Sequence, residues 1–151
     1  MIDAVTDGPV LPFDLRAVAN EIEGVLNEYE TAAAGRIDLT TLWQAWRGFR
    51  DGAEALAEGA EAAAKNPISA LSYDRTLMAV TRLINPVLYQ AGSEFAQDPA
   101  TGTRLLPGLA GLLDLAPADS DALKMQTIGL RRQITRTADA LVRATRHIQR
   151  T

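Results

Sequence analysis

The strongest constraint on the fold is a long amphipathic repeat near the end of the chain. From about residue 120 to residue 147, apolar and small residues recur in alternating steps of four and three, which places them on one side of an α-helix. The repeat consists of Leu123, Thr127, Leu130, Ile134, Thr137, Leu141, Ala144 and Ile148. At about 1.5 Å per residue, such a helix is roughly 40 Å long. Its apolar side requires other long helices to pack against it.

Three further stretches have helical periodicity. The first begins after Asp14, a residue type that caps helices, and should stop near Ala34-Gly35. The second has a similar repeat of apolar and small residues along one side of the helix, and we call such a repeat a seam. It consists of Leu39, Leu42, Trp46, Phe49, Ala53, Leu56, Ala60 and Ala63. Asn66-Pro67 suits the start of the third, whose apolar residues are Leu71, Leu77, Val80, Ile84 and Val87. Pro86 predicts a kink or an end near Asn85.

Residues 91–117 are rich in glycine and proline, which predicts a long loop with one short helix over residues 109–113. The predicted fold class is therefore all-α: a bundle of four main helices, with a long loop and a short helix between helices 3 and 4. We assign residues 14–151 to this helical domain.

Composition excludes several kinds of function. The 151 residues amount to one domain, and no run approaches the roughly 18 apolar residues of a membrane-spanning helix. The absence of cysteine rules out thiolate zinc sites and cysteine nucleophiles. His147 is the only histidine, and no Glu-x-x-His pair of the di-iron type occurs. We therefore expect no catalytic residue, no metal ligand and no cofactor in this chain.

Charge is distributed unevenly along the chain. Residues 121–151 carry a balance of +5, whereas residues 1–120 carry −9. A basic helix can bind phosphates, and a regulator or nucleic-acid domain is one alternative. However, this helix has no aromatic residues for stacking on bases, and the acidic remainder offsets its charge. We therefore expect neither nucleic acid nor a membrane among the partners of this chain.

The two tryptophans are candidates for an interface. Trp46 lies on the seam of the second helix, while Trp43 is offset by three residues and widens the apolar stripe. A broad core face explains both residues, but large aromatic residues on a second stripe are also typical of contacts with another chain. Both readings remain open from the sequence.

The ordered features of the chain resemble a known family. The order is Val10-Leu11-Pro12-Phe13-Asp14, an amphipathic helix, Asn66-Pro67, Leu77-Met78 leading to Asn85-Pro86, Leu106-Pro107-Gly108, and one long final helix. Over about residues 9 to 149, the chain resembles the transferrin-receptor-like dimerisation domain. That domain is the C-terminal helical part of glutamate carboxypeptidase II-like zinc peptidases.

The resemblance implies a zinc-peptidase domain upstream, against which residues 14–151 pack as the dimerisation domain, and a homodimer formed largely through this region. Residues 1–13 would then be a residual linker from the peptidase domain. The zinc belongs to the missing peptidase domain, whose ligands have no counterpart here. The start of the chain fits this view, since residues 1–7 contain two acids and no apolar run of an export signal. The parent can be exported or membrane-anchored, and the sequence assigns no compartment. The interface candidates are Trp43, Trp46, Leu106 and Leu109.

One departure from the family concerns substrate recognition. The carboxypeptidase branch has a Lys-Tyr pair that grips the carboxylate of the substrate, and residues 100–105 contain neither residue type. Arg104 is the nearby cation that could bind an anion instead. The alternative to a dimerisation domain of a zinc peptidase is a free-standing helical protein-interaction adaptor with no enzyme attached.

Overall fold

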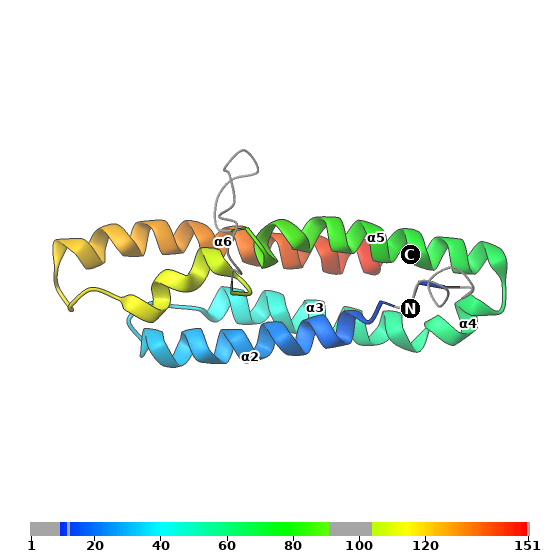
Figure 1. The fold of residues 1–151 in the computed structure, drawn as a ribbon, viewed down its shortest axis with the longest axis horizontal. Coiled ribbons are helices and arrows are strands. Elements are labelled where there is room, and N and C mark those ends of the chain that lie inside the picture. The colour runs from blue at the N-terminus through cyan, green and yellow to red at the C-terminus, as the bar shows by residue number, and fades with distance from the viewer. Residues whose placement is uncertain (1–9, 12, 91–103, 151) are drawn as a thin grey trace.

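The computed structural model describes residues 10–11, 13–90 and 104–150. All regular secondary structure in these ranges is helical, which confirms the predicted all-α class for the described part of the chain. The elements are α2 (Leu15–Ala33), α3 (Thr40–Glu58), α4 (Ala60–Ala64), α5 (Pro67–Leu88), the 3₁₀ helix η1 (Pro107–Asp114) and α6 (Asp121–Ile148) (Figure 1). Of the helices described, none has the length and apolar character to cross a bilayer.

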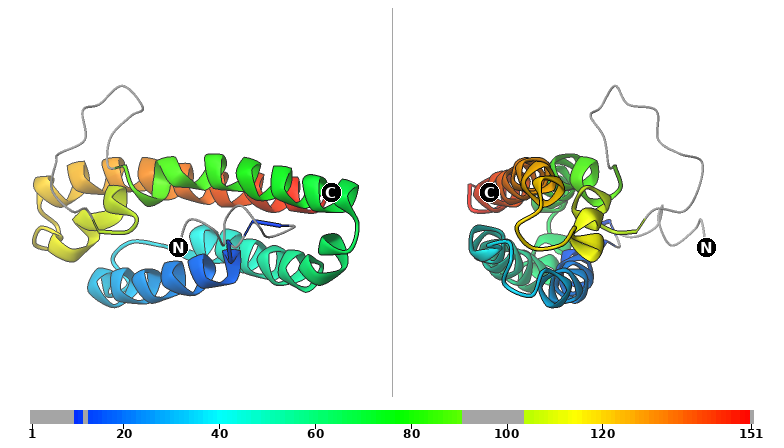
Figure 2. Two further views of the ribbon diagram at one scale, coloured as in Figure 1. Left: turned by 45° about the vertical axis from the view of Figure 1, so that its right-hand side comes forward. Right: turned by 90° about the vertical axis from the view of Figure 1, so that its left-hand side faces the viewer.

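The long helices lie along one common direction. Helix α6 packs against α3 and α5, and α2 packs against α3. In the end view of Figure 2, α2 and α5 share one side of the molecule and α3 and α6 share the other. The 3₁₀ helix η1 packs on α2 and α6 and also touches α5, so it fills part of the space between α2 and α5.

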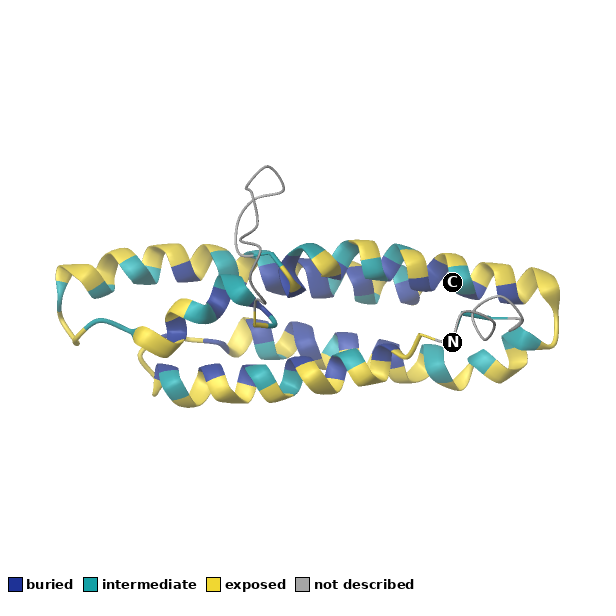
Figure 3. Ribbon diagram, viewed as in Figure 1, coloured by how far each residue is buried: buried dark blue, intermediate teal, exposed yellow. Residues whose placement is uncertain are grey.

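Apolar side chains from every long helix meet in one core, and the exposed residues lie on the outward sides (Figure 3). The seam of α6 is buried from Leu130 to Ile148, as the four-three spacing predicts. Leu123 and Thr127 are only half-buried, because the first turns of α6 have fewer neighbours. The largest fully buried side chains are Tyr29, Phe49, Ile22, Leu26, Leu42, Leu77, Ile84, Leu88, Leu106, Leu109, Leu112 and Leu141.

The predicted helix starts are confirmed by their capping hydrogen bonds. An Asp14 side-chain oxygen accepts the Arg16 N–H at 2.9 Å, and the Asn66 side chain accepts the Ile68 N–H at 2.8 Å. At the other end of α2, Ala34 adopts a left-handed conformation with φ 48°, which ends the helix where the sequence predicts. Short polar side chains thus set the ends of the helices.

Two helices differ in extent from the expectation. The second predicted helix is divided at Gly59 into α3 and α4, because glycine lowers helical stability at that point. Helix α5, for which a kink or an end was expected near Asn85, continues through Pro86 and ends at Leu88. Val87 and Leu88 are buried in this last turn, so core packing outweighs the missing amide donor of the proline.

The predicted short helix at 109–113 is a 3₁₀ helix that covers Pro107–Asp114. It follows Leu106, whose φ of 54° turns the chain sharply into η1. The predicted loop before it lies at residues 91–103, outside the described residues. The linker assigned to residues 1–13 is described only at 10, 11 and 13, where the Leu11 N–H donates to Asp74 Oδ1 on α5 at 2.8 Å.

Candidate protein-interaction surface

Arg104 is engaged by an acid of its own chain. Its Nη2 atom lies 2.5 Å and 2.6 Å from the two carboxylate oxygens of Glu28 on α2. These hydrogen bonds raise the pKa of Arg104 above its ordinary value. Both side chains are about half exposed. A substrate carboxylate would have to displace Glu28, so the geometry favours a role for Arg104 in holding α2 to the segment before η1.

Tyr29, which is buried, also connects α2 to the segment before η1. Its hydroxyl group lies 3.3 Å from the carbonyl oxygen of Leu105 and 3.2 Å from that of Leu106, and it donates to this pair. Burial of the side chain raises the pKa of the Tyr29 phenol. The neutral phenol therefore fixes the sharp turn at Leu106, next to the Arg104–Glu28 ion pair.

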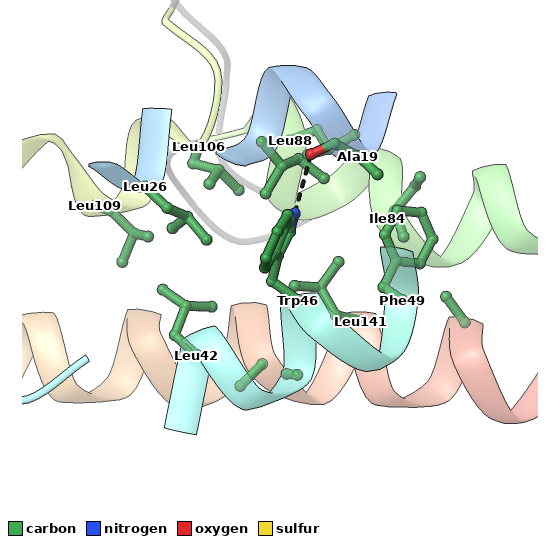
Figure 4. Packing of buried hydrophobic residues seen from close by; sticks show 14 of the residues in the cluster. Ala19, Leu26, Leu42, Trp46, Phe49, Ile84, Leu88, Leu106, Leu109 and Leu141 are labelled. Atoms are coloured by element: carbon green, nitrogen blue, oxygen red, sulfur yellow. Dashed lines mark hydrogen bonds between the residues drawn. The ribbon is translucent and has the colours of Figure 1, made fainter. Parts of the chain in front are cut away.

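The structure separates the two tryptophans. Trp46 is 3% exposed, and its indole N–H donates to the Ala19 carbonyl oxygen at 3.0 Å (Figure 4). Trp43 packs edge-on against Trp46, with 5.3 Å between ring centroids, and remains half-buried. The Arg50 guanidinium lies 4.9 Å from the centroid of a Trp46 ring. Trp46 is therefore a core residue that joins α2 to α3.

Leu106 and Leu109 are core residues as well. They are 1% and 0% exposed, and Figure 4 shows them among buried residues of the other helices. Their side chains, like that of Trp46, are covered by this chain itself. The expectation that these three residues offer surface to a partner is therefore corrected, and Trp43 alone among the four candidates keeps a partly exposed side chain.

A different exposed stripe appears on the outer side of α5. Seven residues recur there in alternating steps of three and four, and all of them are exposed: Ile68, Leu71, Arg75, Met78, Arg82, Asn85 and Tyr89. We call this set the α5 stripe. Leu71 is 50% and Met78 44% exposed, although the periodicity assigned Leu71 to the core. The sequence carries the signal for this stripe, since its spacing equals that of the buried seams.

The exposed row on α2 has the opposite charge. It consists of Ala17, Glu21, Gly24 and Glu28, again in steps of four and three, and we call it the α2 row. Elsewhere on α2, Arg16 pairs with Glu54 of α3 at 3.8 Å. Glu28 instead faces Arg104, near the start of η1.

Several charges of the α5 stripe and the α2 row have no ion-pair partner among the described residues. Within the part of the chain that the structure describes, Arg75, Arg82 and Glu21 take part in no ion pair. By contrast, the basic helix α6 has local pairs, from Lys124 to Asp121 at 2.8 Å and from Arg143 to Asp139 at 4.0 Å. Arg75, Arg82 and Glu21 are thus available to a partner, whereas Glu28 is held by Arg104.

A cavity of about 620 Å³ lies elsewhere, between α3, α4, α5 and the end of α6. Gly52 and Ile148 form part of its wall, and Asp51, Ser72 and Tyr73 contribute polar groups. Asp51 is the one carboxylate among its lining residues, and Arg50 pairs with it at 2.8 Å. The volume suits a small molecule, but these lining residues include no pair of an acid and a base for catalysis.

No group of three or more potential metal ligands occurs among the described residues. Comparison with known proteins adds no relative: no family model matches the chain, and neither a curated protein nor a solved structure is significantly similar to it.

Proposed function

We propose that this chain is a protein-association domain, and in particular the C-terminal dimerisation and accessory domain of a glutamate carboxypeptidase-like zinc metallopeptidase. In this proposal its helices form a bundle of four main helices, which joins two subunits and packs against the catalytic domain. Zinc and the hydrolytic residues belong to the upstream peptidase domain. The chain itself contributes a binding surface and no hydrolytic residue.

The observation that carries the association role is the α5 stripe. Three large apolar side chains, those of Ile68, Leu71 and Met78, lie on the outside at helical spacing. Isolated exposed apolar residues are ordinary, but a regular row of them is typical of a helix that packs against another protein. Arg75 and Arg82 lie among them on the same stripe, and their charges would fix the orientation of a bound partner and favour partners with acidic residues.

The zinc-peptidase context rests on the order of features in the sequence. The Asn66-Pro67 start, the Leu106-Pro107-Gly108 turn and the long last helix are the features that resemble the family. In the structure these residues begin α5, form the turn into η1 and make up α6. The alternative is a free-standing adaptor, because the α5 stripe lies entirely within this chain and needs no enzyme to present it.

The natural reading frame upstream of residue 1 tests the enzymatic context. The proposal predicts a hydrolase domain there, with His, Asp and Glu residues in a zinc-ligand arrangement. The whole protein should then purify with zinc and as two subunits. A gene that begins at this chain, with no hydrolase ahead of it, would contradict the peptidase context. The free-standing adaptor would then be the remaining proposal.

Mutation of the exposed stripe tests the association role separately. Replacement of Leu71 and Met78 by glutamate removes apolar surface that the monomer does not bury. The mass of the natural assembly in solution should fall while the melting temperature of the subunit stays within a few degrees. An unchanged mass would contradict the assignment of this stripe as an association surface.

A further inference from the structure

The cavity between α3, α4, α5 and the end of α6, of about 620 Å³, has the size of a binding site for a small organic molecule. We propose that it binds an organic ammonium ion, that is, a cation whose charged nitrogen carries an apolar body. None of the described residues that line this cavity belongs to the α5 stripe. The inference therefore goes beyond the proposed association role and does not depend on it.

Small side chains on three helices create the hollow. Helix α6 ends at Ile148, whereas α4 and the start of α5 extend past its last turn (Figure 1). The walls of the cavity are built largely from glycine, alanine and serine, which are Gly48, Gly52, Ala55, Ala63, Ser69 and Ser72. These small residues leave open the space that larger side chains would fill, so the sequence itself encodes the hollow.

The inner part of the cavity is apolar. Leu56, Tyr73 and Ile148 line it, and Tyr73 and Ile148 are only 9% and 8% exposed. An apolar body that lies against these side chains loses its contact with water, which favours binding. Four polar lining residues are exposed instead, and these are Asp51, Ser69, Ser72 and Gln149. The cavity therefore suits an amphiphilic molecule with its polar group turned outward.

Asp51 selects the charge of that polar group. It is the one charged side chain among the described lining residues. Arg50 Nε and Nη2 both contact Asp51 Oδ1, at 3.1 Å and 2.8 Å, and the guanidinium lies over a Trp46 ring at 4.9 Å. The second carboxylate oxygen, Asp51 Oδ2, has no hydrogen bond to a described residue. It can therefore accept one from an ammonium group.

The end of α6 favours the same charge. Ile148 and Gln149 line the cavity, so the last turn of this helix ends there. Carbonyl groups at a helix C-terminus carry partial negative charge, which attracts cations and repels anions. Arg146 and Arg150 are exposed and do not line the cavity, whereas residues 51–64 of the opposite wall contain four acids and no base. A carboxylate or phosphate ligand is therefore disfavoured.

The ring of Tyr73 supplies a further contact for a cation. Tyr73 lines both this cavity and a neighbouring one of about 220 Å³. Burial raises the pKa of its phenol, and the charges that act on it include Asp14 and Arg16, which line the smaller cavity. The hydroxyl end thus lies toward the smaller cavity, and the uncharged ring is left to the larger one. The face of an aromatic ring attracts ammonium groups.

NMR titration of the complete, isotope-labelled chain with three octyl compounds tests the proposal. The probe is n-octylammonium, while 1-octanol and octanoate carry the same chain with a neutral and an anionic head group. All three are used below the concentration at which they form micelles. Amide chemical shifts report both the dissociation constant and the place of binding. We expect the largest shifts at Gly48, Gly52 and Ala55, and the tightest binding for n-octylammonium and the weakest for octanoate.

Two variants separate the apolar body from the charged head. Ala55→Phe fills the cavity from an exposed position, and Ala122→Phe on the exposed side of α6 is its matched control. Asp51→Asn removes the charge of the carboxylate. Its control is Asp139→Asn, because Asp139 is also an exposed aspartate that pairs with an arginine of its own helix. Circular dichroism should show similar melting curves for all four variants.

We expect Ala55→Phe to raise the dissociation constant of n-octylammonium at least tenfold. Asp51→Asn should raise it by about two- to fivefold, because the carboxylate is largely exposed and its charge is screened by water. The same variant should leave the binding of 1-octanol unchanged. The two control variants should bind all three compounds as the parent chain does.

Several results would overturn the proposal. Absence of saturable shifts, shifts centred on Met78 and Arg82 of the α5 stripe, or an Ala55→Phe variant that binds like the parent would remove the cavity as the site. Octanoate that binds as tightly as n-octylammonium, or an Asp51→Asn variant with unchanged affinity for n-octylammonium, would remove the ammonium ion as the ligand class. The association role is decided separately by the mass of the assembly.

Discussion

Trp46 on α3 donates its indole N–H to the backbone carbonyl oxygen of Ala19 on α2, with 3.0 Å between nitrogen and oxygen. The ring is 3% exposed, and Ala19 is fully buried. Ala19 is small enough for the two helices to approach at this point. The bond therefore sets how α2 lies on α3 and gives a buried polar atom its partner.

Replacement of Trp46 by phenylalanine should destabilise the domain. The change removes the donor to Ala19 and leaves space beside a buried ring, and the two losses together amount to about 1 to 3 kcal/mol in the free energy of unfolding. Urea denaturation monitored by circular dichroism measures this difference.

Trp43 offers the matched control. Its Nε1 atom is buried without a hydrogen-bond partner in the described part of the chain. The phenylalanine replacement at Trp43 deletes an unsatisfied donor, so the stability should change by less than about 1 kcal/mol. Equal losses for the two variants would contradict the roles assigned to the two rings.

Leu109 should act on stability and not on association. It is fully buried in η1, so Leu109→Ala should cost about 2 to 5 kcal/mol through lost burial and a cavity. The comparable exposed residue Met125 on α6 should tolerate alanine with little loss. Thermal denaturation measures both. A Leu109→Ala variant with full stability and weaker pairing would restore its role as an interface residue.

Asp14 should contribute to the acid sensitivity of the domain. Its side-chain hydrogen bond to Arg16, together with the cap to the Arg16 N–H, lowers the pKa of Asp14 below the ordinary value of 3.8. A carboxyl group whose pKa is lowered by folding stabilises the protein above its unfolded pKa. That contribution is lost as the pH falls through the lower, folded value.

Asp14→Asn keeps a cap acceptor but cannot titrate. The melting temperature of the variant should therefore fall less steeply than that of the parent between about pH 5 and pH 2. Melting curves across this range provide the measurement. Parallel curves for the two proteins would show that this carboxyl group has no part in acid unfolding.

Pro86 lies inside α5 and has no N–H for the helix. Its carbonyl oxygen accepts a hydrogen bond from Arg136 Nη2 at 3.3 Å, a contact that alanine at this position can keep. Pro86→Ala should therefore raise the free energy of unfolding by roughly 1 to 2 kcal/mol, since the restored helical bond exceeds the added freedom of the unfolded chain. Denaturant unfolding measures the gain, and a loss of stability would contradict it.

Periodicity and capping residues were sufficient to predict the helices, because both act locally. Asp14, Asn66 and Ser120 accept backbone N–H groups in the first turns of α2, α5 and α6. The division at Gly59 has a local cause that the apolar repeat does not register, whereas the continuation of α5 through Pro86 depends on tertiary packing.

The candidate site was harder to predict because burial depends on distant segments. Leu106 and Leu109 follow a Gly- and Pro-rich stretch, yet η1 folds into the space between α2 and α5 and covers them. Leu71 follows the same helical periodicity as Val80 but lies outside, since no described helix packs on that side of α5. The ion pair of Arg104 with Glu28 joins residues 76 positions apart.

The most direct test of the association role is sedimentation equilibrium of the complete 16.2 kDa chain over a wide concentration range. The account predicts a mass that rises with concentration to that of two chains, and pairing that weakens with added salt because charged residues contribute to it. A mass of one chain at every concentration and salt would contradict it.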